Sequence, residues 1–177
     1  MLNLNFTPFP TIITQRLVLR QLRDDDVHEL FALRTDERVN RFLDRPLPKS
    51  LNDVREFIAK VNQMTHDNAG LYWVITRKNE DKLLGTIGLR NFEPEQYQAE
   101  IGYELHPHHQ GQGFMHEAIT HVLAYGFGRL GLQTITADTD PGNLRSIQLL
   151  EKHGFVKINR LENTYLLRDK KLPNFLA

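Results

Sequence analysis

The spacing of apolar residues changes several times along the chain, and each change predicts a different secondary-structure element. Residues 16–20 form a short apolar run between charged residues, which is typical of a strand. Apolar residues then recur at helical spacing over residues 27–34 and 52–63, which predicts two helices. The acidic residues 24–26 precede the first helix, where negative charge favours a helix N-terminus.

A different pattern follows in the middle of the chain. Three apolar and β-branched runs, 72–76, 83–89 and 99–105, are separated by the polar segments 77–82 and 91–98. Connections this short join antiparallel neighbours, because a parallel pair needs a long crossover. The three runs therefore predict an antiparallel meander.

The segment after the meander predicts such a crossover. Strand 99–105 is followed by a loop rich in His, Gln and Gly, by an amphipathic helix over residues 114–130 and by a β-branched strand over residues 134–139. A unit of this length makes the two strands parallel, with a right-handed connection. The helix N-terminus then lies at the carboxyl end of the first strand, where α/β folds bind ligands, and anions in particular.

The remaining segments predict a short helix over residues 146–153 and two strands over residues 155–158 and 164–167. The whole pattern predicts an α/β fold of the α+β type, with a mixed, mostly antiparallel central sheet and one β-α-β crossover. The chain has 177 residues and no evident linker, so we interpret residues 1–177 as a single domain.

The composition narrows the class of protein. The chain carries 22 basic and 22 acidic residues, so it lacks the positive excess of most nucleic-acid-binding domains. It has no cysteine, which excludes disulfides, thiolate catalysis and Cys-based zinc sites. No apolar run approaches the roughly 18 residues of a membrane span, and the N-terminus lacks the pattern of a signal peptide. We therefore expect a cytoplasmic protein without a nucleic-acid or membrane partner.

The segment Gln110–Met115, Gln-Gly-Gln-Gly-Phe-Met, stands directly before the crossover helix. Gly111 and Gly113 permit a tight or left-handed backbone that aims several N–H groups into one space, which suits a diphosphate. A simple turn is the alternative. A dinucleotide fingerprint would need a glycine where His116 stands, and the Gly-Lys-Ser/Thr of a P-loop is absent. His116 and His121 are five residues apart, which is wrong for the zinc-protease helix.

Four stretches, in this order and spacing, resemble a known family: Thr14–Arg20 followed by Asp25-Asp26, Glu100–Leu105, Gln110–Gly113, and Asp140–Phe155 with its Asn-x-x-Ser and Glu-Lys-x-Gly-Phe elements. The family is the GCN5-related N-acetyltransferase superfamily, within it the RimJ/RimL-like branch that acetylates ribosomal proteins. The resemblance extends from about Thr14 to Leu167. It implies the fold of that family, with helices on both faces of the sheet.

The resemblance also implies acetyl-CoA as cosubstrate, with no metal. Its pyrophosphate would bind the amides of the glycine loop, and its pantetheine arm would lie between strands 99–105 and 134–139, which splay apart. Asn143 would bind the pantetheine arm, and Ser146 would lie near the sulfur. The residues implied in cofactor binding are Leu105, His106, Gln110, Gly111, Gln112, Gly113, Phe114, Met115, Asn143 and Ser146.

Three departures from the family pattern matter. Met115 stands where the loop usually has Gly or Ala, but a backbone N–H survives that change. Leu150 stands where many relatives carry a tyrosine that protonates the departing thiolate, so that role is empty or passes to Ser146. The C-terminal segment over residues 157–167 looks shorter than in typical relatives, and part of the acceptor pocket is built there.

The expected reaction is direct attack of an amine on the thioester in a ternary complex. Deprotonating an α-amine at pH 7 costs about 1.4 kcal/mol and a lysine over ~4 kcal/mol, so a base helps. Glu100 and Glu104 are the candidate bases, because residues four apart share one face of a strand, and Glu162 is a third. Each is alternatively a solvated carboxylate. A backbone N–H near Leu105-His106 would bind the thioester oxygen.

Other polar residues have structural alternatives. His106, His108 and His109 could relay a proton or bind a metal, or they form a polar surface loop without a metal. His116 and His121 are interpreted as helix-surface residues. Asn143 and Ser146 could also serve only as residues at a helix N-terminus. Among the aromatic residues, Tyr103 is interpreted as a sheet residue that could line an acyl cavity.

These observations predict an acetyl-CoA-dependent N-acetyltransferase whose acceptor is a primary amine, by resemblance a protein N-terminal α-amine. A small-molecule amine, such as a polyamine, an amino sugar or an antibiotic, is the alternative acceptor. A non-catalytic CoA-binding regulatory module and a plain nucleotide-binding protein are the alternatives of another class. The resemblance also allows a homodimer.

Overall fold

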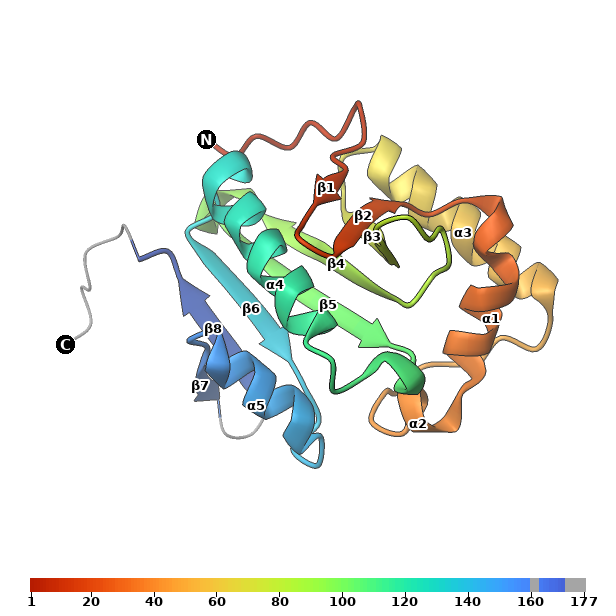
Figure 1. Cartoon of the computed structure of the whole chain (residues 1–177). Helices are drawn as coiled ribbons and strands as arrows, with labels where there is room; N and C mark the ends of the chain where they lie inside the picture. Colours follow the sequence, from red (N-terminus) through yellow and green to blue (C-terminus); the bar gives the residue numbers. More distant parts are fainter. Residues whose placement is uncertain (160–162, 171–177) are drawn as a thin grey trace.

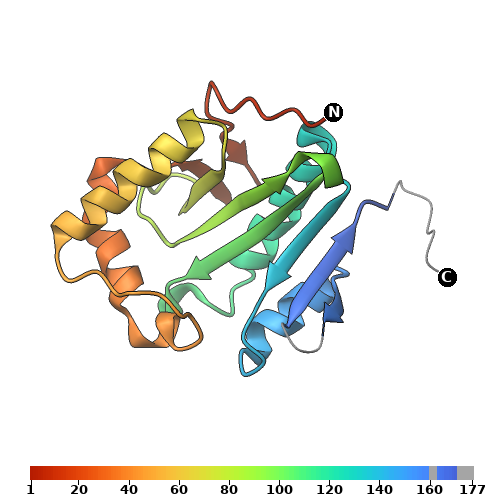
Figure 2. The ribbon, with the colours of Figure 1, turned by 180° about the vertical axis from the view of Figure 1, so that it is seen from behind.

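The computed structural model describes residues 1–159 and 163–170, which contain one eight-stranded sheet (Figures 1 and 2). The strand order is β1-β2-β3-β4-β5-β6-β8-β7. All neighbours are antiparallel except β5 and β6, which are parallel. The strands are β1 Ile12–Ile13, β2 Leu17–Gln21, β3 Leu71–Arg77, β4 Gly85–Glu93, β5 Gln98–Leu105, β6 Thr134–Asp138, β7 Val156–Asn159 and β8 Thr164–Arg168.

Helices cover both faces of this sheet, as the resemblance implies. Figures 1 and 2 show α4 and α5 on one face and α1 and α3 on the other. Within the described residues, no helix is both long and apolar enough to span a bilayer. The helices are η1 Asp24–Asp26, α1 Val27–Thr35, α2 Glu37–Asn40, α3 Leu51–His66, η2 Pro94–Gln96, η3 Pro107–His109, α4 Phe114–Tyr125, the π-helical η4 Gly126–Leu130, and α5 Leu144–Lys152.

The alternation of side chains along β3 builds a core on each face. Trp73 and Ile75 are fully buried beneath α4, in the larger cluster, which also contains Leu150 of α5. Val74 points to the other face, where it packs in the cluster formed by α1 and α3. Each fully buried side chain of this size contributes about 1.5–3 kcal/mol. The two cores fix both helix layers on the sheet and so fix the loops between them.

The structure differs from the sequence prediction in a few segments. The predicted helix 114–130 is α-helical only to Tyr125 and continues as the π-helical turn η4. At the start of that turn, a Cβ on Gly126 would lie 3.1 Å from the Ile135 side chain, so the helix approaches the sheet closely there. The predicted strand 83–89 begins at Gly85 and extends to Glu93. The short elements β1 and α2 have no periodic pattern and were not predicted.

The parallel pair β5–β6 opens along its length. The register joins Gln98 to Thr134, Ala99 to Ile135 and Glu100 to Thr136. Beyond Glu100, the rest of β5 has no β6 partner among the described residues. The splay implied by the family resemblance is therefore present, and it opens toward the loop that precedes α4.

Two histidines join α4 to α5. His116 Nδ1 lies 3.0 Å from His153 Nε2, so the interpretation of His116 as a plain helix-surface residue is wrong. Burial, with the neighbouring His116 and then Lys152, lowers the pKa of His153 to about 4 from its ordinary value of 6.5. The unfolded chain therefore binds this proton at a higher pH than the folded chain does.

This pKa predicts a stability change in acid. Between pH 6.5 and about pH 4, the unfolded state binds more protons, so the free energy of unfolding falls as the pH falls. Because His153 is half-exposed, solvent screening weakens this effect. We expect His153 to account for a loss of ~1 kcal/mol in the free energy of unfolding at pH 5. We expect His153→Gln to show a smaller loss of Tm between pH 7 and pH 5 than the native chain. The exposed His28→Gln is the control, and equal losses in all three proteins would contradict the assignment.

Candidate active site

The loop between β5 and α4 forms a cradle of free backbone amides. Gly111 and Gly113 have φ angles of +76° and +80°, the left-handed region that favours glycine. Within the described chain, the N–H groups of residues 111–116 donate to no protein acceptor. They stand at the N-terminus of α4, whose dipole adds partial positive charge. The loop therefore has the free amides and the positive helix end that an anion would need, and anion binding there stays a prediction.

The start of β2 holds this cradle in place. Arg16 donates from Nη1 to the Gln112 carbonyl at 2.9 Å and pairs through Nε with Glu117 Oε2 at 2.6 Å. Glu117 Oε1 also accepts from the Thr14 hydroxyl at 2.6 Å. Burial opposes ionisation of Glu117, but the hydrogen bonds from Thr14 and Arg16 lower its pKa overall. The sequence predicts only a strand for Thr14 and Arg16, because the partner Glu117 lies about a hundred residues away in sequence.

Other predicted cofactor residues contribute in different ways. The Gln110 amide donates from Nε2 to the Leu105 carbonyl at 3.0 Å, and its Oε1 accepts from Arg145 of α5. Gln110 therefore bridges the two sides of the splay. Phe114 and Met115 are buried in the core, so only their backbone faces the loop.

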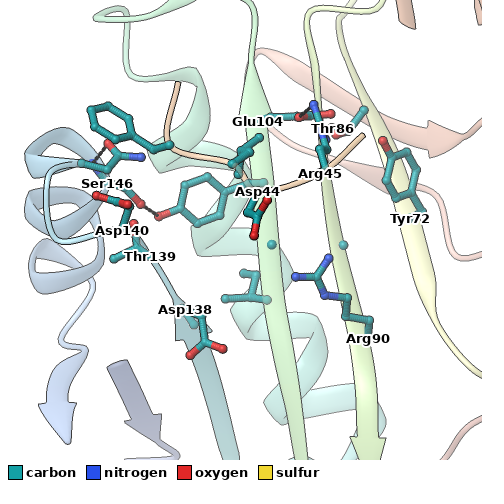
Figure 3. Close-up of a pocket in the computed structure, with 18 of the residues that line it drawn as sticks. Asp44, Arg45, Tyr72, Thr86, Arg90, Glu104, Asp138, Thr139, Asp140 and Ser146 are labelled. Atoms are coloured by element: carbon teal, nitrogen blue, oxygen red, sulfur yellow. Dashed lines mark hydrogen bonds and ion pairs between the residues drawn. The ribbon is translucent and has the colours of Figure 1, made fainter. Parts of the chain in front are cut away.

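A cavity of about 790 Å³ adjoins the splay on the side opposite α4 (Figure 3). Residues of α1, α3, β3, β4 and β5 form one wall, and the end of β6 with the first turns of α5 forms the other. The loop after α2 contributes Phe42 to Arg45. Phe42 reaches the turn that precedes α5, since a Cβ on Gly142 would lie 3.2 Å from its ring. The cavity thus reaches both strands of the splay.

Glu104 lies in the wall of this cavity. Its carboxylate is only 8% exposed and pairs with Arg45 at 2.7 Å and with Arg34 at 3.9 Å (Figure 3 shows Arg45 beside Glu104). Tyr72 and Thr86 also line the cavity, and Thr86 is the cross-strand neighbour of Glu104. Burial, with the Glu104 charge second, raises the pKa of the Tyr72 phenol, which therefore stays neutral.

Glu100 has a different environment, although it shares a strand face with Glu104. Its carboxylate pairs with Arg90 at 2.5 Å and accepts from Asn91 Nδ2 at 2.7 Å. Arg90 is its cross-strand neighbour, and Glu100 does not line the cavity. Of the two predicted carboxylates, Glu104 is the one that faces the cavity. The third, Glu162, lies outside the described residues.

Ser146 and Tyr103 meet across the splay. Their hydroxyl oxygens share a hydrogen bond of 2.8 Å, and both residues line the cavity. Burial raises the pKa of Tyr103 to about 12, so this phenol holds its proton near neutral pH. Asn143 caps α5, because its Oδ1 accepts from the Ser146 N–H at 3.2 Å. Asn143 thus has the helix-capping role that was the alternative to cofactor binding. The Ser146 side chain faces Tyr103 and does not cap the helix.

The loop that carries His106, His108 and His109 differs from the prediction that a backbone N–H near Leu105-His106 binds the thioester oxygen. The His106 N–H donates to the Leu84 carbonyl at 2.9 Å, so it is not free to bind a thioester oxygen. The His106 ring lies 4.8 Å from that of His108 and 5.9 Å from that of His109, measured between centroids. Burial lowers the pKa of His106 and of His109. Within the described ranges, no group of three or more His, Asp or Glu side chains could hold a metal ion.

Comparison with known proteins agrees with this geometry. Residues 16–156 match a family model described as an acetyltransferase (GNAT) domain. An uncharacterized N-acetyltransferase, YoaA, from Bacillus subtilis (strain 168) is 36% identical over 149 residues, which cover 84% of each chain. The chain therefore belongs to the GNAT acetyltransferase family. Within that family of acyltransferases, it is an N-acetyltransferase.

Two solved structures share the fold at lower identity. RimL, a ribosomal L7/L12 alpha-N-protein acetyltransferase in complex with coenzyme A, is 18% identical with a TM-score of 0.79, covering 90% of this chain and 98% of that chain. A spermidine N-acetyltransferase from Vibrio cholerae, in complex with CoA and spermine, is 24% identical with a TM-score of 0.75, covering 88% and 96%. At these identities the likeness extends to the fold alone.

Proposed function

We propose that this N-acetyltransferase takes its acetyl group from acetyl-CoA and transfers it directly to the α-amine of a protein N-terminus. The observation that supports this most is the opening of β5 from β6 beside a loop of free amides. The left-handed Gly111 and Gly113 leave those amides exposed to a diphosphate. The two structural neighbours described above hold CoA in the same fold.

Acetyl-CoA, when bound, supplies an activated thioester whose thiolate leaves readily. The chain's own residues would do the rest. The amides after Gln110 would bind the pyrophosphate, and the free edge of β5 would orient the pantetheine arm. Glu104 would orient the acceptor amine or receive its proton. The Tyr103–Ser146 pair would hold a proton beside the splay.

The α-amine is favoured as acceptor by its acidity. Its pKa of about 8 leaves roughly a tenth of it neutral at pH 7, whereas a lysine amine is almost entirely charged. Glu104 is held by two arginines, so it suits an acceptor that needs little help in losing a proton. A polyamine is the second candidate acceptor, because a neighbour of the same fold acts on spermidine.

The hydroxyl pair gives a testable assignment. Leu150 lies on the cavity wall where many relatives carry a tyrosine, and Tyr103 supplies a phenol at the same cavity. We expect Tyr103→Phe and Ser146→Ala each to lower kcat about tenfold, with little change in KM for acetyl-CoA. The expected loss is smaller than the roughly hundredfold or greater effect usual for a general acid, because a thiolate leaves without much help. Steady-state kinetics of both variants provide the measurement, and an unchanged kcat in both would remove the pair from the reaction.

The proposed reaction is tested by thiol release from acetyl-CoA, read with a disulfide reagent. The chain has no cysteine and therefore adds no thiol background. The acceptors are peptides with free N-termini, the same peptides N-acetylated, spermidine and an aminoglycoside. Thiol release that requires the free peptide N-terminus supports the proposal. Thiol release with spermidine alone would show that the acceptor is a polyamine and not a peptide N-terminus. Binding of acetyl-CoA without release on any amine would indicate a non-catalytic CoA-binding module.

A further inference from the structure

The wall around Glu104 holds more positive than negative charge. Arg34 and Arg45 both pair with the same carboxylate, and their side chains are only 14% and 21% exposed. The two cations thus face one anion in the wall of the cavity. A surplus charge in such a place is costly unless a counter-charge joins it.

The other contacts of the two arginines are neutral. The Arg34 guanidinium lies 3.9 Å from the Phe57 ring centroid, a cation–π contact that provides no negative charge. Arg45 donates from Nε to the Asn40 side-chain oxygen at 2.9 Å. The adjacent Tyr72 phenol is neutral because burial raises its pKa. Burial, followed by repulsion from Arg45, lowers the pKa of Arg34, as expected where one carboxylate serves two guanidinium groups.

The remaining acidic residues of the cavity are exposed. Asp138 and Asp140 belong to the β6 side, across the cavity from Tyr72 and Arg90 in Figure 3. Asp140 Oδ1 accepts from the Gly142 N–H at 2.7 Å, so that oxygen is engaged in the turn. Asp44 is exposed on the loop after α2. On the basic side, Arg90 pairs with Glu100, and Lys60 is exposed. The surplus of positive charge beside Glu104 thus belongs to the partly buried Arg34 and Arg45.

We propose that the acceptor carries a carboxylate close to its reacting amine, and that this carboxylate binds Arg34 and Arg45 beside Glu104. The inference rests on the proposed amine acetylation and specifies its substrate class. One added carboxylate gives two cations and two anions, and guanidinium groups match a planar carboxylate through paired hydrogen bonds. A doubly charged phosphate would bring two negative charges to a site that has only one positive charge in excess. A polyamine would place further positive charge against the two arginines.

Two kinds of acceptor share this chemistry: a peptide whose first residues include Asp, and a small amino acid derivative. Matched pairs separate the contribution of the charge from that of shape. The peptide pair is Ser-Asp-Ala-Ala-amide and Ser-Asn-Ala-Ala-amide. The small pair is aspartic acid 1-amide and asparagine amide. In each pair the reacting amine has nearly the same surroundings, and only one member carries a carboxylate.

The native enzyme should favour the acidic member of at least one pair by about tenfold or more in kcat/KM, since a charge-assisted pair is worth at least that ratio. Arg45→Gln should reduce this ratio toward one, mainly by slowing the acidic member. Arg129→Gln, an exposed arginine of η4 outside the cavity, is the control and should keep the ratio. The pair that shows the preference identifies the kind of acceptor.

Turnover with equal kcat/KM for both members of both pairs would overturn the carboxylate inference and leave the acetylation intact. If no amine is turned over, the proposed acetylation fails, and the inference is still tested by binding. Calorimetry would then compare N-acetylated Ser-Asp-Ala-Ala-amide with its Asn counterpart in the presence of CoA. Tighter binding of the acidic member, lost in Arg45→Gln, would support the carboxylate site, and equal or absent binding of both would overturn it.

Discussion

Glu104→Gln is expected to lower kcat/KM for the amine acceptor by about a hundredfold, the lower range for loss of an acid–base group. The carboxylate is buried at the cavity wall and holds both Arg34 and Arg45. Its loss leaves two guanidinium groups without a counter-charge, so we also expect a decrease of ~3 kcal/mol in the free energy of unfolding. Steady-state kinetics and urea denaturation measure the two effects.

Glu100→Gln is the matched control. Glu100 lies four residues earlier on the same face of β5, but its partner Arg90 is 58% exposed. A surface pair of this kind contributes about 0–1 kcal/mol, and the cavity does not include Glu100. We therefore expect the activity of this variant to stay close to native. A larger loss of activity in Glu100→Gln than in Glu104→Gln would reverse the assignment of the two carboxylates.

Gly113→Val is expected to weaken CoA binding by about a hundredfold. Gly113 has a φ of +80°, and its Cβ would lie 3.2 Å from Arg16 Nη2. This atom belongs to the guanidinium group whose Nη1 donates to the Gln112 carbonyl of the loop. A β-branched residue in this conformation carries ~3 kcal/mol of strain, which only a rearranged loop relieves, and 1.4 kcal/mol corresponds to tenfold in affinity. Isothermal titration with CoA gives the dissociation constant directly.

Gly128→Val is the matched control, because it makes the same substitution at a glycine outside the loop. Gly128 lies exposed in η4, and a Cβ there meets no atom within 4 Å. Its affinity for CoA should equal that of the native chain. Tm measurements on both variants show whether Gly113→Val still folds, since the strain lies in an exposed loop. Native CoA affinity in a folded Gly113→Val would contradict the placement of the pyrophosphate.

The sequence predicted those parts of the fold that depend on local periodicity. The meander, the crossover helix and the cradle at Gly111 and Gly113 follow from spacing and from glycine, because these patterns act over a few residues. The opening of β5 from β6 came from the family resemblance rather than from the pattern itself. The continuation of α4 as a π-helical turn was not predicted. The close approach of Gly126 to Ile135 at that point is a tertiary contact, which no local pattern contains.

The chemistry of the cavity was harder to predict for the same reason. Glu100 and Glu104 have the same residue type, strand and face, so spacing cannot distinguish them. The distinction comes from Arg34 in α1 and Arg45 in the loop after α2, both distant from Glu104 in sequence. Tyr103 faces Ser146 only because α5 returns to the open edge of β5. Such contacts are products of tertiary packing.

The proposed reaction is acetyl transfer from acetyl-CoA to a terminal α-amine. Its most direct test is tandem mass spectrometry of a peptide that carries a free N-terminus, an acidic second residue and an internal lysine, after incubation with the enzyme and acetyl-CoA. We predict one enzyme-dependent acetyl group, located on the α-amine and greatly reduced with Glu104→Gln. Acetylation confined to the lysine, or an unmodified peptide when CoA binding is confirmed, would rule out this reaction.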